Sequence, residues 1–228
     1  MQTVERGRRA TFPSRRPLFY YITDRKQLAD KPLLWCIGRA IGWGVDFVQI
    51  REKDLCDRSL YELTRKVVQA ASGTHCRILV NGRADIALAA CADGVHLPSA
   101  GLLATNIRPW LPRGFLIGVS THLRQEGVRA AAAGADYVLL GPIYPTESKL
   151  RYGPPLGLDY FRQACRALPI PVLGLGGIRP EHVSPVLEAG AAGVAGIGLF
   201  QKDSDFRELS RMTRNQIARS SQWISENS

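Results

Sequence analysis

Polar and charged side chains follow short apolar runs at several points along this chain. The first group is Gln49-Ile50-Arg51-Glu52-Lys53, which comes directly after Phe47-Val48. Alternation along an extended strand points Gln49, Arg51 and Lys53 to the same side. Two cations beside an amide are suited to binding an anion, and Glu52 is a candidate partner for Arg51. A solvated basic turn is the alternative.

Three further polar motifs also follow apolar runs. Asn81-Gly82-Arg83 either contributes to a site or forms a turn in which Asn81 caps a helix. His96-Leu97-Pro98-Ser99 is the second motif. The third, Ser120-Thr121-His122, places a histidine at an expected helix start, where a neutral imidazole can exchange protons near neutral pH. Alternatively, Ser120 or Thr121 serves only as a helix cap.

Two later segments are suited to holding a phosphate. Thr146, Ser148 and Lys149 place two hydroxyls and an ammonium within four residues of a long loop, which could act as an anion clamp and a lid. Backbone N–H groups at glycines of the last two expected loops could form a phosphate cup, although tight packing would also explain these glycines. They are Gly176, Gly177, Gly196 and Gly198.

A recurring junction indicates the elements that must position these groups. In it a helix ends in small residues and a strand begins on a small or acidic residue followed by Val. It occurs four times, at spacings that each fit one βαβα quarter of a barrel: residues 44–48, 91–95, 134–138 and 190–194. Gly at such a junction accepts the left-handed conformation that ends a helix.

Apolar runs between the junctions complete a set of eight short strands. They are residues 18–22, 77–80, 115–119 and 171–175. Helical periodicity is present at 33–43, 57–72, 83–91, 122–133, 157–167 and 180–189, with a shorter piece at 104–110 and a longer helix from about 204. Continuous alternation of strand and helix predicts a single-domain α/β protein, a (β/α)8 TIM barrel. A doubly wound open sheet is the alternative, but no G-x-G-x-x-G turn follows the first strand.

Composition limits the class of protein. A chain of 228 residues that is 45% hydrophobic suits one domain at 18–228, after a basic extension at 1–17 that we expect to be disordered. The extension accounts for much of the net charge of +10, so we expect no nucleic-acid partner. No membrane-spanning run and no signal peptide are found, which predicts a cytoplasmic protein. The five scattered cysteines indicate neither a disulfide framework nor a zinc site.

Six motifs in order resemble the thiamine phosphate synthase/TenI superfamily between residue 18 and about 200. They are Gln49-x-Arg51-x-Lys53, Asn81-x-Arg83-x-Asp85-Ile86-Ala87, Gly94-Val95-His96-Leu97, Gly118-x-Ser120-x-His122, Thr146-x-Ser148-Lys149 and Gly176-Gly177-Ile178. The synthase joins hydroxymethylpyrimidine diphosphate to a thiazole phosphate with the help of Mg²⁺.

The resemblance implies site residues for both substrates. The pyrimidine diphosphate would contact Gln49, Arg51, Lys53, Asn81 and Lys149. The thiazole phosphate would contact Thr146, Ser148 and the backbone of Gly177 and Gly198, and we include Ser120 and Gly176 among the substrate-binding residues.

Two glycines depart from the synthase pattern. Gly82 and Gly101 stand where synthases carry aspartates that bind Mg²⁺. This resembles the TenI branch, whose thiazole tautomerases need no metal and use a histidine that corresponds to His122. Mg²⁺ prefers carboxylates together with phosphate oxygens, so we predict no protein metal site.

Three functions follow from the resemblance. We expect first a TenI-like thiazole tautomerase, an isomerase that needs no cofactor, in which His122 moves the proton and Arg51 and Lys53 bind the substrate carboxylate. The alternative is a thiamine phosphate synthase, a transferase that uses Mg²⁺. The third is a catalytically silent ligand-binding or regulatory barrel. The expected partner is a small phosphorylated thiazole, with the pyrimidine diphosphate if the protein is a synthase, and the chain could form a homo-oligomer.

Overall fold

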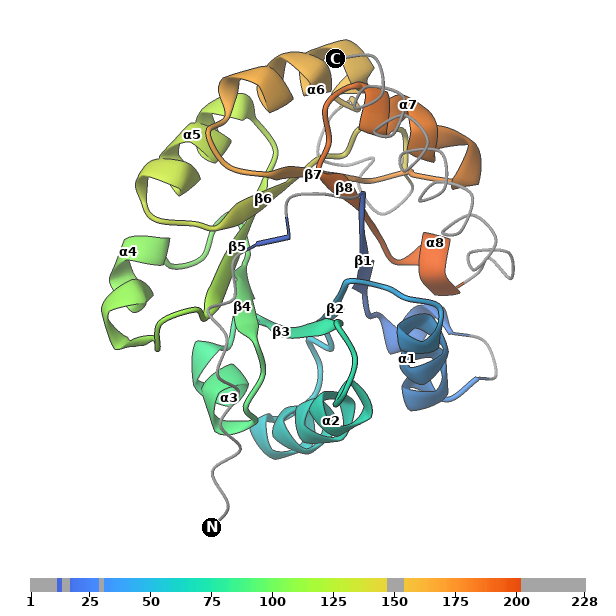
Figure 1. The fold of residues 1–228 in the computed structure, drawn as a ribbon, viewed down its shortest axis with the longest axis vertical. Helices are drawn as coiled ribbons and strands as arrows, with labels where there is room; N and C mark the ends of the chain where they lie inside the picture. The colour runs from blue at the N-terminus through green and yellow to red at the C-terminus, as the bar shows by residue number, and fades with distance from the viewer. Residues whose placement is uncertain (1–11, 14–16, 29–30, 147–153, 202–228) are drawn as a thin grey trace, which may run out of the picture.

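Eight parallel strands form a closed barrel in which β1 to β8 follow one another in sequence order (Figure 1). The computed structural model describes residues 12–13, 17–28, 31–146 and 154–201. Ser148, Lys149 and the helix expected from about residue 204 lie outside the described residues. Within them, helices alternate with strands and surround the barrel, so the predicted (β/α)8 architecture is confirmed.

The strands are short, as predicted. Their bounds are β1 (Leu18–Ile22), β2 (Phe47–Ile50), β3 (Arg77–Asn81), β4 (Gly94–Leu97), β5 (Leu116–Thr121), β6 (Tyr137–Leu140), β7 (Val172–Leu175) and β8 (Gly193–Gly196). The α-helices are α1 (Leu33–Gly42), α2 (Asp57–Ala70), α3 (Ala84–Ala89), α4 (Ala104–Ile107), α5 (Arg124–Ala132), α6 (Gly157–Ala167), α7 (Val183–Glu188) and α8 (Gly198–Gln201). The described residues also form the 3₁₀ turns η1 (Arg25–Gln27), η2 (Arg108–Trp110) and η4 (Pro180–His182).

The core has two layers, because successive side chains of a strand point to opposite faces. On β1, Phe19 and Tyr21 pack outward against the helices, whereas Leu18, Tyr20 and Ile22 pack inside the barrel. The inner layer is completed by Phe47, Leu79, Leu116, Tyr137, Leu139, Leu173 and Ala195. The barrel interior is therefore filled by side chains, and a ligand must bind at one of its ends.

The recurring junctions have the backbone conformation that the sequence predicts. Gly44, Gly134 and Gly190 have φ angles of 88°, 85° and 101°, in the left-handed region. In the remaining junction this position is held by Cys91, with φ 57°. Each junction therefore ends its helix by one left-handed residue, which turns the chain toward the next strand.

Three of the four junctions carry an acidic residue, which has a role that the sequence pattern did not reveal. One carboxylate oxygen of each accepts a hydrogen bond from a backbone N–H of the preceding strand: Phe19 donates to Asp46, Ile78 to Asp93 and Ile117 to Asp136, at 2.7 to 2.9 Å. These carboxylates lie at the N-terminal ends of the strands. They therefore stabilise the barrel at the end opposite the expected site.

Phe12 packs against the interior of the barrel. Its ring stacks on Phe47 and Tyr137, with centroid distances of 5.4 and 5.0 Å. Tyr137 begins β6 and Phe47 begins β2, so Phe12 covers the inner layer at the N-terminal ends of these strands.

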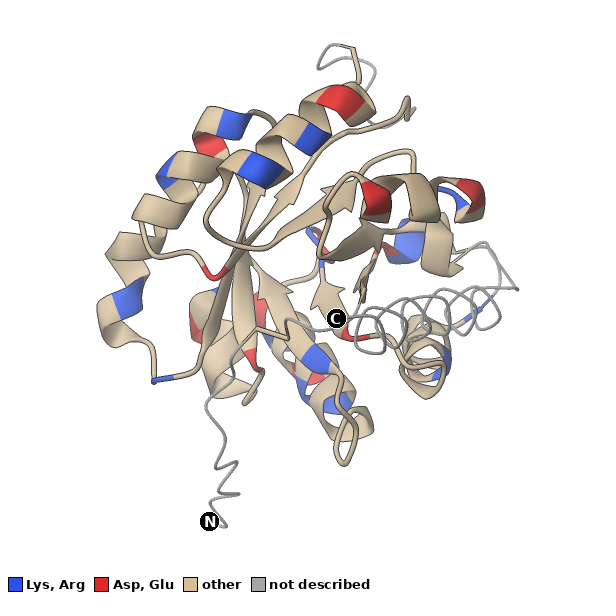
Figure 2. Ribbon diagram, turned by 45° about the horizontal axis from the view of Figure 1, so that its top comes forward, with Lys and Arg blue, Asp and Glu red and all other residues tan. Residues whose placement is uncertain are grey.

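Charged residues of both signs are interspersed over the outer helices (Figure 2). None of the helices in the described segments combines the length and apolarity needed to cross a membrane.

Candidate active site

The described site residues predicted from the sequence gather at one end of the barrel, where the strands end. Because all strands are parallel, their C-terminal ends form one face, which we call the mouth. The residues come from the ends of β2, β3, β5, β7 and β8 and from the loop after β6: Gln49, Arg51, Lys53, Asn81, Ser120, His122, Thr146, Gly176, Gly177 and Gly198.

A continuous chain of hydrogen bonds crosses the barrel interior beneath the mouth. We call it the inner hydrogen-bond chain, and it runs in the order Asn81, Gln49, Tyr20, Tyr137, His96 and Ser120. Gln49 Nε2 donates to Asn81 Oδ1 at 2.9 Å, and Tyr20 Oη donates to Gln49 Oε1 at 3.2 Å.

The other half of the chain joins the two tyrosines to Ser120. The Tyr20 and Tyr137 hydroxyl oxygens lie 2.9 Å apart, and Tyr137 Oη lies 3.2 Å from His96 Nδ1. His96 Nε2 lies 2.8 Å from Ser120 Oγ. Two polar groups at the mouth, Asn81 and Ser120, are therefore connected through the protein interior.

Burial keeps the titratable members of this chain neutral. Desolvation lowers the pKa of His96 from 6.5 to about 3, and it raises the pKa of both Tyr20 and Tyr137. The imidazole therefore carries a single proton at neutral pH, on one of its two nitrogens, and the phenols keep their protons.

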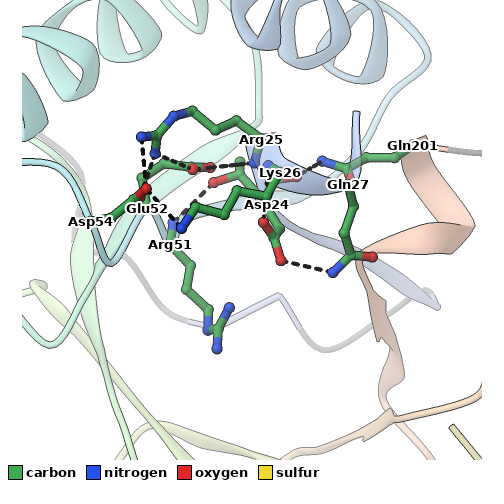
Figure 3. Close-up of polar contacts among 9 residues, drawn as sticks. Asp24, Arg25, Lys26, Gln27, Arg51, Glu52, Asp54 and Gln201 are labelled. Carbon is green, nitrogen blue, oxygen red and sulfur yellow. Dashed lines mark hydrogen bonds and ion pairs between the residues drawn. The ribbon is translucent and has the colours of Figure 1, made fainter. Parts of the chain in front are cut away.

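Glu52 does not pair with Arg51, which was its candidate partner from the sequence. The buried Glu52 carboxylate instead accepts hydrogen bonds from the backbone N–H and Nη1 of Arg25, at 3.1 to 3.2 Å (Figure 3). Arg25 also pairs with Asp54, at 2.7 and 3.0 Å. The sequence could not show this because Arg25 follows a different strand, β1.

Asp54 belongs to the same charged cluster. Its pKa is lowered to about 2 by hydrogen bonds from Lys26 and Arg25. The side chain of Arg51 points away from this cluster (Figure 3), and its backbone N–H is fixed by a 2.9 Å hydrogen bond to Thr23 Oγ1. Arg51 is half-buried, and Lys53 is exposed on the following turn. The arrangement leaves the Arg51 cation directed away from the nearby carboxylates.

His122 is held in one tautomer by the backbone. Its Nδ1 lies 2.7 Å from the carbonyl oxygen of Gly141, and since a carbonyl can only accept, Nδ1 carries the proton. The Glu126 carboxylate accepts the His122 backbone N–H. In the neutral ring, Nε2 is therefore the unprotonated nitrogen, which is the state required of a general base.

The loops after β6 and β7 are packed closely together. Gly176 and Gly177 have φ angles of 92° and 65°, and a Cβ at Gly177 would lie 2.8 Å from the Tyr144 Cβ. The ring of His182, in η4, stacks on Tyr144 at 3.9 Å. Close packing therefore explains both glycines without a ligand, and it brings the segment that carries Thr146 beside the loop after β7.

The residues at the mouth do not fit a Mg²⁺ ion. Gly82 has a φ of 69°, and a Cβ there would lie 3.8 Å from Pro98 Cδ. A Cβ at Gly101 would lie 3.0 Å from the same ring. The apolar ring of Pro98 therefore borders both positions at which the family pattern places aspartates.

Four other carboxylates near the mouth are held by arginines. Glu52 and Asp54 pair with Arg25, and Asp57 and Asp85 pair with Arg83. Within the described ranges no group of three or more His, Cys, Asp and Glu residues could hold an ion.

Several residues that the structure brings to the site have no role predicted from the sequence. His96, Tyr20 and Tyr137 are buried polar side chains inside the barrel, and Arg25 neutralises Glu52. Strand alternation could have identified His96, because it shares its strand face with Gly94. A polar residue on an inward position needs a hydrogen-bond partner.

The chain matches known proteins over most of its length. The family model for thiamine monophosphate synthase matches residues 19–200. A Geobacter sulfurreducens protein named "Putative thiamine-phosphate synthase" is 46% identical over 192 residues, which cover 84% of this chain and 90% of the relative. The thiamine-phosphate synthase of Roseiflexus castenholzii is 36% identical, and the match covers 81% of each chain.

A solved structure has the same fold. Thiamine phosphate pyrophosphorylase from Pyrococcus furiosus matches with a TM-score of 0.78 and 28% identity, covering 90% of this chain and 98% of the other.

Proposed function

Since this chain belongs to the thiamine monophosphate synthase family, we propose that it is a thiamine-phosphate synthase, a transferase that joins a pyrimidine diphosphate to a thiazole phosphate. The observation that carries this proposal is the 46% identity, over 84% of the chain, with the relative named "Putative thiamine-phosphate synthase". The names of the relatives favour the transferase over the isomerase that sequence analysis placed first.

In this proposal the charged side of the mouth binds the diphosphate. Arg51, which Figure 3 shows directed away from Glu52, and Lys53 supply the positive charge, and Lys149 adds to it. Fixed cations stabilise the negative charge that a departing diphosphate carries. Gln49 and Asn81 contact the pyrimidine at the end of the inner hydrogen-bond chain.

The thiazole phosphate is assigned to the loops after β6, β7 and β8. Thr146, Ser148 and the backbone of Gly177 and Gly198 are suited to a phosphate, because N–H and O–H groups are its natural donors. We place this activity in the cytoplasm, in keeping with the sequence-based expectation.

A second candidate is the thiazole tautomerase, and the Mg²⁺ misfit favours it. Gly82, Pro98 and Gly101 supply no carboxylate where the synthase pattern needs two. A proton transfer within a single thiazole phosphate requires a base and no metal. His122 has the tautomer for that role, with an unprotonated Nε2.

One experiment distinguishes the two candidates. The purified chain is incubated with both synthase substrates, with and without Mg²⁺, and thiamine phosphate is quantified. Turnover supports the synthase, and Arg51→Ala should then reduce it. No product, together with interconversion of carboxythiazole phosphate tautomers that His122→Ala abolishes, would replace the synthase with the tautomerase. The absence of turnover in both assays would indicate a ligand-binding barrel.

A further inference from the structure

We infer that Tyr20 and Tyr137 are positioning residues which, through His96, make the Ser120 hydroxyl a hydrogen-bond acceptor for the substrate at the mouth. The effect on substrate binding rests on the proposed function. The protonation state of His96 does not depend on the proposed function. The inference and the proposed function can therefore fail separately.

The direction of the inner hydrogen-bond chain follows from its amide end. Gln49 Nε2 donates to Asn81 Oδ1, so Gln49 Oε1 accepts the proton of Tyr20. Tyr20 has then used its single proton, and its oxygen must accept from Tyr137 at 2.9 Å.

The same argument continues to the mouth. Tyr137 gives its proton to Tyr20, so its oxygen accepts from His96 Nδ1–H at 3.2 Å. The neutral imidazole then has an unprotonated Nε2, which accepts the Ser120 hydroxyl proton at 2.8 Å. Ser120 retains only lone pairs for a ligand. It therefore favours a substrate group that carries N–H or O–H over a carbonyl or phosphate oxygen.

Gly118 makes room for this arrangement. It lies opposite Tyr137 in the pairing of β5 with β6 and opposite His96 in the pairing of β4 with β5. A Cβ at Gly118 would overlap the phenol of Tyr137 and lie 2.6 Å from His96 Nδ1. The absence of a side chain at this inward position thus lets the Tyr137 phenol reach the His96 imidazole. The hydrogen bond between them therefore depends on the residue at position 118.

Nitrogen NMR of ¹⁵N-histidine-labelled protein tests the direction. We expect His96 Nδ1 to give the protonated signal and Nε2 the unprotonated signal at neutral pH, with assignment by loss of the signals in His96→Gln. Tyr137→Phe removes the acceptor and should shift His96 toward a mixture of tautomers. The reverse pattern in the wild type, with Nε2 protonated, would overturn the inference.

Kinetics with the two synthase substrates provide the second readout. Tyr137→Phe should raise the KM of one substrate about fivefold, the effect of one misdirected hydrogen bond, and leave kcat within about twofold. Tyr61→Phe, which changes a tyrosine packed on the outer core, is the matched control and should change neither. Unchanged tautomer and KM in Tyr137→Phe would also overturn the inference.

Two further variants keep the inference testable if the first one fails to fold. If Tyr137→Phe does not fold, Tyr20→Phe interrupts the same chain one step earlier and should give the same NMR change. Gly118→Ala should displace the Tyr137 phenol and disturb the His96 signals most. If the wild type turns over neither substrate, the proposed function fails, and the NMR experiment still decides the inference.

Discussion

Arg51 and Arg25 follow neighbouring strands, yet their guanidinium groups have different electrostatic environments. Arg25 is held by two carboxylates, whereas Arg51 is directed away from both (Figure 3). A cation that is directed away from carboxylates already paired with another arginine can bind an anionic ligand. Arg25 therefore contributes to the site indirectly, by occupying Glu52.

Arg51→Ala should weaken the binding of inorganic diphosphate about tenfold, as expected for the loss of one charge-assisted contact. Isothermal titration calorimetry measures the dissociation constant directly. Arg65→Ala, on the exposed side of α2, is the control and should bind like the wild type. Equal affinities in all three proteins would show that the diphosphate is bound elsewhere.

His96 should make the protein sensitive to acid. Its pKa is lowered to about 3 in the folded state, so below its ordinary value of 6.5 the unfolded chain binds a proton that the folded chain refuses. This group's contribution to stability is complete above pH 6.5 and falls by roughly 1.4 kcal/mol per pH unit as the pH drops toward 3.

Urea unfolding of the wild type and His96→Gln over that pH range measures the effect. The variant cannot titrate at this position, so its stability should fall less steeply with acid, whatever its stability at neutral pH. Parallel curves would contradict the assigned protonation of His96.

Single residues were the least predictable part of the site. Local context identified Gln49, Arg51 and His122 as polar residues at strand ends. It could not assign the partners, because Arg25 and Glu52, or Tyr137 and His96, follow or belong to different strands and meet only when the barrel forms. Aromatic residues on inward positions are also typical of an ordinary core.

Elements were more predictable, because their signals are local. The predicted helix at 157–167 coincides with α6, and the four junctions have left-handed residues where the pattern placed them. The pattern did not show that Asp46, Asp93 and Asp136 bond to the preceding strand, since that contact needs the parallel pairing.

Gly134→Ala tests the junction conformation in isolation. The position has φ 85° and open space where the methyl group of an alanine would lie, so only backbone strain opposes the change. We expect a loss of about 1 kcal/mol in the free energy of unfolding. Gly38→Ala, in open space inside α1 and without a positive φ, should instead stabilise the protein by roughly 0.5–1 kcal/mol. Losses of equal size in both variants would contradict the conformational explanation.

The whole molecule was predictable from repetition. Eight strand–helix alternations of similar length permit few topologies, and a closed barrel gives every short strand two neighbours. The covering of the N-terminal end of the barrel was not predictable. Phe12 lies before residue 19, where the family match begins. It also lies in an arginine-rich segment, whose composition does not predict packing against a core.

Phe12 should contribute to the stability of the whole barrel, because its ring packs on the inner layer through Phe47 and Tyr137. Phe12→Ala should lower the free energy of unfolding by about 1–3 kcal/mol, less than for a fully buried phenylalanine because the residue is only partly buried. Trp110→Ala removes a larger aromatic that is 73% exposed and should change stability by less than about 0.5 kcal/mol. Urea denaturation of the three proteins measures both effects. If the two variants lose equally little, the stacking of Phe12 does not help to hold the barrel together.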